Sequence, residues 1–137
     1  MRRLAAAAAI ALLALAGCGG QSDKQKIEST ITDYYKAFGS GDMKAACSHL
    51  TADAVKLLEA SGRAKCPAVL ATALKRPAYA RIAPKLKGVK VIAVKVSGAN
   101  ASATAQLPGA GAGGAPVNTS VPLTKEGGDW KIVSTAG

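Results

Sequence analysis

Three cysteines and one histidine are the residues of this chain with the most versatile side-chain chemistry. A thiol can take a lipid, form a disulfide, bind a metal or act as a nucleophile, and an imidazole can move protons near neutral pH. The cysteines are Cys18, Cys47 and Cys66, and the histidine is His49. Each of these positions needs its own interpretation, because their sequence surroundings differ.

The segment that ends at Cys18 has the features of an export signal. Arg2 and Arg3 precede an uninterrupted apolar run over residues 4–16. That run has the length of a signal-peptide core and is too short to span a bilayer, which takes about 20 apolar residues. It ends in Leu15-Ala16-Gly17-Cys18, which resembles the lipobox of bacterial lipoproteins.

The lipobox resemblance implies both processing and location. In that family a diacylglycerol is attached to the cysteine thiol, and cleavage occurs just before it. We therefore expect residues 1–17 to be a removed signal, residues 18–23 to be a lipidated tether that starts at Cys18, and residues 24–137 to be one domain. The protein is then held at a cell membrane and faces outside the cytoplasm, at the cell surface or in a periplasm.

The two remaining cysteines form an even pair in an exported chain. Export places Cys47 and Cys66 where disulfides persist, and a helical hairpin between them would bring the thiols together. Two buried free thiols are the alternative. The sequence does not favour a metal site, because His49 lacks the additional ligands and spacing that such a site needs. We expect neither a metal nor another cofactor.

The charge of the chain is unevenly distributed. The formal net charge is +10, and the stretch Lys56–Lys95 holds ten Lys or Arg residues against one acid, Glu59. One interpretation is a solvated face; the other is attraction to anionic lipid or to an anionic cell-wall polymer. We expect no nucleic-acid partner, because export removes the chain from nucleic acid and the sequence has no recognisable nucleic-acid-binding motif.

The hydrophobic pattern predicts helices first and strands afterwards. Apolar residues at helical spacing, with capping residues at their ends, predict a long helix and several shorter ones over 22–38, 42–49, 51–62, 67–76 and 78–84. Alternating or β-branched runs predict antiparallel strands over 89–96, 101–107, 117–125 and 130–133, with a mobile Gly/Ala-rich loop at 108–116. This order predicts an α+β fold, with helices on one face of the sheet.

Two motifs carry a family resemblance. The long helix ends in Tyr34-Tyr35-Lys36-Ala37-Phe38-Gly39-Ser40-Gly41-Asp42, and the chain closes with Leu123-Thr124-Lys125-Glu126-Gly127-Gly128-Asp129-Trp130-Lys131-Ile132. Together they resemble the nuclear transport factor 2-like superfamily, also called SnoaL-like or cystatin-like. Within this superfamily the chain resembles small exported lipoproteins of high-GC Gram-positive bacteria whose functions are unassigned.

The resemblance implies a specific architecture. N-terminal helices pack in the concave face of a curved C-terminal antiparallel sheet and form a cone that is open at one end. Many proteins of this fold dimerise through the outer sheet face. Here that face carries Ser102, Thr104 and Gln106, which leaves a homodimer open.

Some members of this superfamily are isomerases, dehydratases or cyclases, and they place Asp, His or Tyr inside the cone. This chain offers few such groups. We expect His49 to be a helix-end or surface residue, and only one of Tyr34 and Tyr35 to face the cone while the other packs outward. Three aspartates at helix or turn positions are expected to cap helices or to face water; they are Asp33, Asp53 and Asp129.

These observations predict a protein that is not an enzyme. We expect a membrane-anchored, non-catalytic domain that binds a small apolar ligand in the cone or an anionic partner through Lys56–Lys95. The alternative is an isomerase-type or dehydratase-type enzyme that uses the cone as its active site, for example through Tyr34 or Tyr35 with an acid.

We predict that the mature protein begins at Cys18 and carries lipid, which intact-mass measurement of the membrane-extracted protein will detect. The Cys18→Ala variant should leave the membrane fraction, because it has no thiol to acylate. An unmodified Cys18, or a variant that still partitions wholly with membranes, would contradict the prediction.

Overall fold

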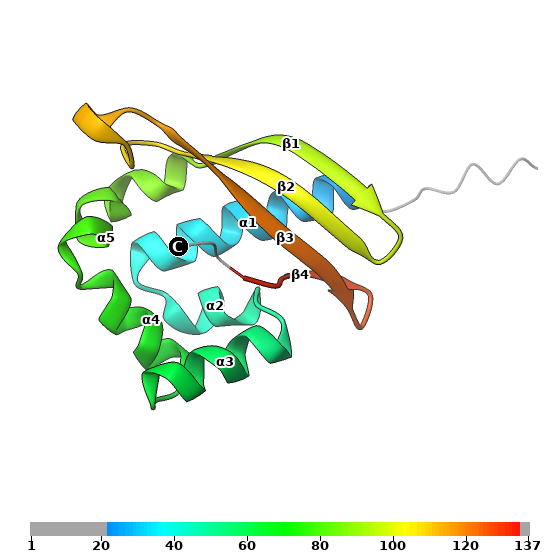
Figure 1. Cartoon of the computed structure of the whole chain (residues 1–137), viewed down its shortest axis with the longest axis horizontal. Coiled ribbons are helices and arrows are strands. Elements are labelled where there is room, and N and C mark those ends of the chain that lie inside the picture. Colours follow the sequence, from blue (N-terminus) through cyan, green and yellow to red (C-terminus); the bar gives the residue numbers. More distant parts are fainter. Residues whose placement is uncertain (1–21, 135–137) are drawn as a thin grey trace, which may run out of the picture.

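The computed structural model describes residues 22–134, so the predicted signal, Cys18 and most of the tether lie outside the described residues. Within 22–134 the chain folds into helices followed by a four-stranded antiparallel sheet, which confirms the predicted α+β class (Figure 1). The helices are α1 (Asp23–Ser40), α2 (Met43–Ser48), α3 (Ala52–Gly62), α4 (Cys66–Leu74), α5 (Pro77–Ile82) and the 3₁₀ helix η1 (Ala83–Gly88). The strands are β1 (Lys90–Ser97), β2 (Asn100–Leu107), β3 (Val117–Glu126) and β4 (Asp129–Ile132), with a 3₁₀ turn η2 (Ala112–Gly114) before β3.

Local capping signals fix the ends of the first helices. Ser22 and Gln25 form a capping box at the start of α1, in which each side chain bonds the other residue's backbone N–H. Gly41 ends α1 with a φ of 85°, a left-handed conformation that favours glycine. The Asp42 side chain then accepts from the Ala45 backbone N–H and starts α2.

The strands pair in chain order, β1-β2-β3-β4, each antiparallel to the next. The alternation predicted for β2 is confirmed, since Ala101, Ala103 and Ala105 are buried on one face. Gly127 and Gly128 connect β3 to β4 with φ values of 58° and 85°, as a two-residue hairpin turn requires.

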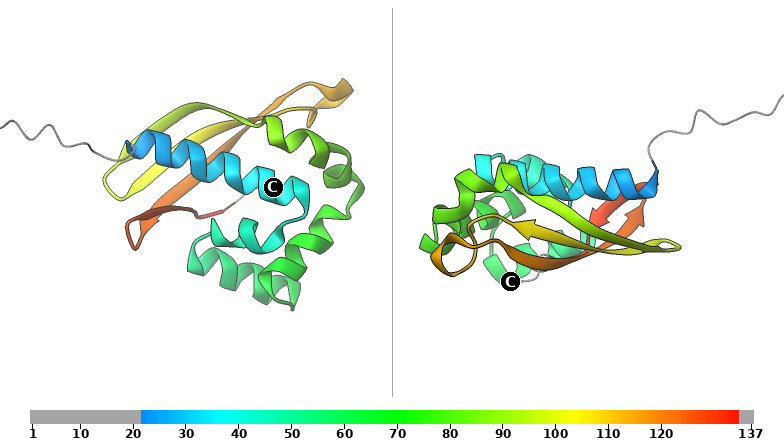
Figure 2. Two further views of the ribbon diagram at one scale, coloured as in Figure 1. Left: turned by 180° about the vertical axis from the view of Figure 1, so that it is seen from behind. Right: turned by 90° about the horizontal axis from the view of Figure 1, so that it is seen from above.

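Helix α1 lies against the concave face of the sheet and fills most of it (Figure 2). Its buried stripe is Ile27, Ile31, Tyr34 and Phe38, and it packs on the inward faces of the strands. The buried sheet residues in this core are Ala101, Ala103, Ala105, Val121, Leu123, Trp130 and Ile132. The buried side chains of α1 and of the sheet form one core, so side chains fill the narrow part of the cone.

The start of α1 is attached to the β3–β4 hairpin by one carboxylate. Asp23 accepts a hydrogen bond from the Trp130 indole N–H at 3.0 Å. It also forms an ion pair with Lys125 at 3.1 Å. The Lys125 ammonium also lies 5.2 Å from the centroid of the Trp130 ring. The Trp130 hydrogen bond, followed by the Lys125 contact, lowers the pKa of Asp23 below its usual value.

The segment after α2 extends the sheet at its β4 edge. The Ile132 backbone N–H donates to the His49 carbonyl at 2.8 Å, and the Thr51 N–H donates to the Ile132 carbonyl at 2.9 Å. Leu50 thereby forms a parallel bridge with Ile132. This pairing satisfies edge groups of β4 and places the end of α2 beside the sheet.

The helices at the wide end of the cone are held together by a disulfide, and η1 makes close backbone contact with α1. A disulfide joins Cys47 at the end of α2 to Cys66 at the start of α4, with their Cα atoms 6.2 Å apart, which agrees with the predicted bridge. At Gly39 an added β-carbon would lie 2.5 Å from the Ala83 carbonyl oxygen. Glycine at this position therefore lets η1 approach α1 closely.

Replacing both bridge cysteines by alanine (Cys47→Ala with Cys66→Ala) should lower the free energy of unfolding by about 3 kcal/mol. The expected loss follows from removing a cross-link of sequence separation 19 from the unfolded chain. Urea unfolding followed by the fluorescence of Trp130, the single tryptophan, measures it. An unchanged urea midpoint would show that the bridge does not stabilise the fold.

Candidate functional site

Two pockets in the described residues are candidates for function, and the first is apolar. It lies at the wide end of the cone, between the C-terminal half of α1 and helices α3, α4, α5 and η1, and its volume is about 190 Å³. We call it the apolar pocket. Its lining is Tyr34, Tyr35, Phe38, Leu58, Val69, Leu70, Ala73, Arg76, Tyr79, Ile82, Leu86 and Leu107.

Four of the chain's five aromatic side chains line the apolar pocket, and they contact one another. The Tyr34 and Tyr35 rings meet edge-on at 5.2 Å between centroids. Tyr34 stacks on Phe38 at 6.3 Å, and Phe38 meets Tyr79 edge-on at 5.9 Å. Such offset and T-shaped pairs are the favoured aromatic geometries and make a pre-formed wall.

The expectation that only one of Tyr34 and Tyr35 faces the cone is wrong. Both residues line the apolar pocket, with Tyr34 buried and Tyr35 half-buried. The reason is geometric, because successive helix residues are separated by about 100° rather than 180°. A pocket as wide as this one therefore receives two neighbouring rings from α1.

Burial in the apolar pocket changes the pKa of Tyr35. Desolvation raises the pKa of Tyr35 far above its ordinary value, and the neighbouring Tyr34 and Tyr79 phenols add to the rise. Tyr35 therefore keeps its proton at all physiological pH values. Its hydroxyl is available as a neutral hydrogen-bond donor and acceptor inside an otherwise apolar wall.

Arg76 is the single charged residue of the apolar pocket lining as the structure describes it, and carboxylates and imidazoles are missing from that lining. Its side chain is exposed and forms no ion pair or hydrogen bond with another described residue. The Arg76 carbonyl accepts from the Tyr79 N–H at 3.0 Å in the first turn of α5. Arg76 is thus the N-cap of α5, and both it and Tyr79 line the apolar pocket.

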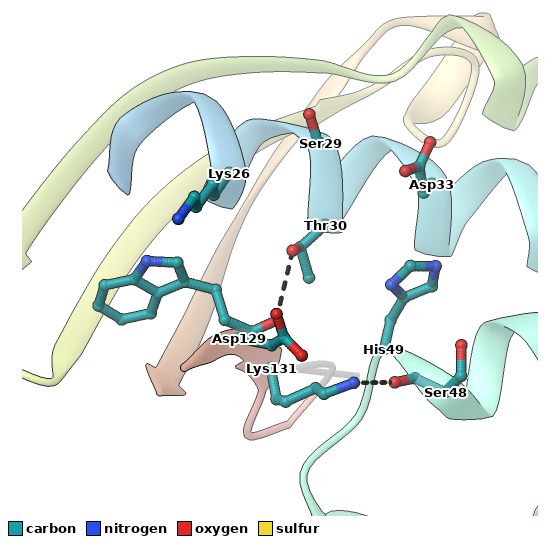
Figure 3. Close-up of a pocket in the computed structure, with 9 residues that line it drawn as sticks. Lys26, Ser29, Thr30, Asp33, Ser48, His49, Asp129 and Lys131 are labelled. Atoms are coloured by element: carbon teal, nitrogen blue, oxygen red, sulfur yellow. Dashed lines mark hydrogen bonds between the residues drawn. The ribbon is translucent and has the colours of Figure 1, made fainter. Parts of the chain in front are cut away.

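The second candidate is polar and lies where α1, the end of α2 and β4 meet (Figure 3). We call it the polar groove. It is open to solvent, with a volume of about 370 Å³, and its lining is Lys26, Ser29, Thr30, Asp33, Ser48, His49, Asp129, Trp130 and Lys131. The Thr30 hydroxyl donates to the Trp130 carbonyl at 3.3 Å, and the Lys131 ammonium donates to the Ser48 carbonyl. These two bonds tie β4 to both helices.

His49 has the most versatile side-chain chemistry in the polar groove. It caps the C-terminus of α2, which agrees with the expected helix-end position, and its half-buried ring points toward Asp33 (Figure 3). Desolvation lowers the pKa of His49; Asp33 opposes this shift and Lys131 adds to it. His49 is therefore mostly neutral at pH 7.

The sequence did not indicate that these groups would meet. Asp33 and Asp129 are exposed, as expected for carboxylates that face water, yet both lie at the polar groove with His49. Asp53 instead faces solvent in the first turn of α3, 3.8 Å from Lys56. The groove is assembled from segments about 100 residues apart in the chain, and no local spacing could reveal it.

The basic stretch runs from α3 through α4, α5 and η1 to β1. Two of its residues have acidic partners: Lys56 pairs with Asp53, and Lys65 pairs with Glu59 at 3.7 Å. These pairs are solvent-exposed and contribute little stability. The other cations of this stretch make no ion pair with described residues, so the helices around the apolar pocket carry excess positive charge.

Residues 22–134 contain no helix that is long and apolar enough to cross a membrane. They also contain no group of three or more His, Cys, Asp or Glu side chains that could hold a metal ion.

Comparison of the three-dimensional structure with solved structures identifies the fold. The chain matches a crystal structure from Campylobacter jejuni, provisionally named a nuclear transport factor 2-like transpeptidase, with a TM-score of 0.53. The match covers 83% of this chain and 100% of the other at 14% sequence identity. The domain has the nuclear transport factor 2-like fold. At this identity the likeness concerns the fold alone. No protein-family model and no curated protein matches the chain.

His49 should make stability pH-dependent. Its folded pKa lies below the ordinary value of 6.5, so protonation favours the unfolded chain. This contribution is complete above about pH 7 and falls as the pH drops through 6.5. Urea midpoints should therefore fall from about pH 7.5 to 5, and His49→Gln should flatten that slope.

The single histidine also permits a direct check, because one Hε1 resonance titrates. Asp33 and Lys131 face His49 from α1 and β4, and Lys26 and Asp129 line the same groove. A measured pKa at or above 6.5 would contradict the lowered value and remove the predicted slope.

Proposed function

We propose that the chain is a lipid-anchored extracytoplasmic protein whose domain binds a small apolar ligand in the apolar pocket without catalysing a reaction. The observation that carries this proposal is the gathering of four of the chain's five aromatic residues around one unfilled pocket. Trp130 is the one further aromatic residue of a mainly aliphatic core, so this wall is the region best suited to hold an apolar molecule.

The filling of the cone supports the same location. Helix α1 occupies the concave face along Ile27 and Ile31, which are fully buried, so a ligand has no room there. The open end is covered by α3, α4, α5 and η1, and these short helices leave about 190 Å³ between them and α1. Sites for drug-sized ligands measure roughly 300–1,000 Å³, so the expected ligand is smaller than those.

The chemistry of the lining supports binding rather than proton transfer. An isomerase or dehydratase mechanism needs a base in reach of the substrate. The described lining instead offers three phenols, of which Tyr35 has a raised pKa, and one guanidinium, Arg76. Of these, Arg76 does not accept protons near neutral pH.

Transpeptidase chemistry, named for the Campylobacter jejuni protein, calls for a nucleophile. Cys47 and Cys66 are joined in the disulfide, so neither offers a thiolate. In the polar groove the Ser48 hydroxyl donates to the Ala45 carbonyl at 2.6 Å rather than to His49. These contacts favour the non-catalytic proposal over an acyl-transfer enzyme.

The proposal also gives the anchor and the charges a role. Helix α1 begins at Asp23, five residues after Cys18, and the apolar pocket lies at the opposite end of that helix. The pocket can thus sit away from the lipid anchor.

The basic stretch Lys56–Lys95 meets anionic lipid or a cell-wall polymer, or draws anions toward the pocket. A homodimer through the outer sheet face stays open.

Filling the apolar pocket should weaken the binding of neutral apolar probes. We expect hexanamide and phenylacetamide to bind the full chain in phosphatidylcholine nanodiscs, and Ala73→Phe to weaken that binding about 10-fold or more because the new ring occupies the pocket. Isothermal titration calorimetry, with empty nanodiscs as the blank, measures both affinities.

The matched control is Ala68→Phe, which adds the same ring at an exposed position of the same helix, outside the pocket. This variant should bind both amides like the unaltered chain. Equal weakening by both variants, or no binding by the unaltered chain, would overturn the proposed site.

A further inference from the structure

We infer that the ligand of the apolar pocket is a small carboxylate with an apolar body, a single ring or a short chain, and that Arg76 binds its charged group. The inference rests on the proposed function and names the class of ligand for that site. Its basis is the placement of one unpartnered guanidinium at the edge of an aromatic pocket.

The first argument is charge complementarity. Arg76 contributes the single charge of the described lining, and no Asp or Glu of the described chain pairs with it. A guanidinium presents a planar fork of donors that matches the two oxygens of a carboxylate. A neutral apolar ligand would leave these donors without a charged acceptor, whereas a carboxylate would accept hydrogen bonds from them.

The second argument is the position of Tyr79 and Tyr35. Tyr79 and Tyr35 line the same pocket as Arg76, and Tyr79 lies in the first turn of α5, for which Arg76 is the N-cap. The Tyr35 and Tyr79 phenols are close enough to interact electrostatically. Their hydroxyls can donate to a carboxylate that Arg76 holds, while the rings contact the apolar body.

The third argument is the charge around the pocket. Arg81 lies in α5, and Lys85 and Lys87 lie in η1, and none of them has an ion-pair partner in the described chain. Their combined potential attracts anions and repels cations near the pocket. A carboxylate therefore has a favourable approach as well as a complementary site.

The size of the pocket limits the apolar part of the ligand. A volume of about 190 Å³ is below the range for drug-sized ligands, and the wall is made of packed rings. Carboxylates with one ring, such as phenylacetate, or with a short chain, such as hexanoate, match this size.

The test compares each carboxylate with the amide of the same shape. In nanodiscs of uncharged phosphatidylcholine, the full chain should bind phenylacetate and hexanoate about 10-fold more tightly than phenylacetamide and hexanamide. Arg76→Gln should remove this difference by weakening carboxylate binding to the level of the amides. Arg81→Gln, which removes a neighbouring exposed charge outside the lining, should keep the difference.

Failure of the inference and failure of the proposed function give different results. If the amides bind and the carboxylates bind no better, or if Arg76→Gln keeps the preference, the carboxylate inference is overturned while the apolar site stands. If none of the four probes binds the unaltered chain, the proposed function itself is overturned. Unchanged urea midpoints in both arginine variants establish that the charges, not the fold, were altered.

Discussion

The packing of α1 into the concave face of the sheet is the contact on which the other features depend. Ile27, Ile31, Tyr34 and Phe38 form one buried stripe along the helix, and it meets a sheet face on which β2 places Ala101, Ala103 and Ala105. The helix approaches β1 and β4 most closely, and the larger buried residues of β3 and β4 complete the core. Since apolar burial dominates folding, this contact holds the domain together and fixes where any cavity can remain.

The two ends of α1 are used differently. At its start, Asp23 binds Trp130 and Lys125, so this end is attached to the hairpin by a polar contact that stays partly in water. At its other end, α3, α4, α5 and η1 surround the pocket beside the helix, together with the end of β2. The Cys47–Cys66 disulfide joins α2 to α4 and stabilises this layer of short helices. Packing of short helices against four aromatic rings is what leaves the apolar pocket.

The two pockets differ in the chemistry that they offer. The polar groove gathers His49, Asp33 and Lys131 in open contact with water, where charges are screened and a substrate would be weakly held. The apolar pocket has fewer polar groups but a desolvated aromatic wall and a single guanidinium. Ligand binding draws most of its free energy from such desolvated surfaces, with a few polar groups to set orientation. The predicted anchor, the charge distribution and the apolar pocket are the features from which we propose a domain that captures small anions outside the cytoplasm.

The sequence by itself determined the elements, their order and their ends. Capping residues such as Ser22 and Asp42, the Gly127-Gly128 turn and the alternation of Ala101, Ala103 and Ala105 act over a few residues, so they can be read locally. The same holds for the export signal before Cys18, which is a prediction from sequence alone. Only the tertiary structure decided that Tyr34 and Tyr35 share one pocket with Arg76, and that His49 lies near Asp33 and Asp129. Those contacts join segments far apart in the chain, and their geometry depends on how α1 and the short helices pack on the sheet.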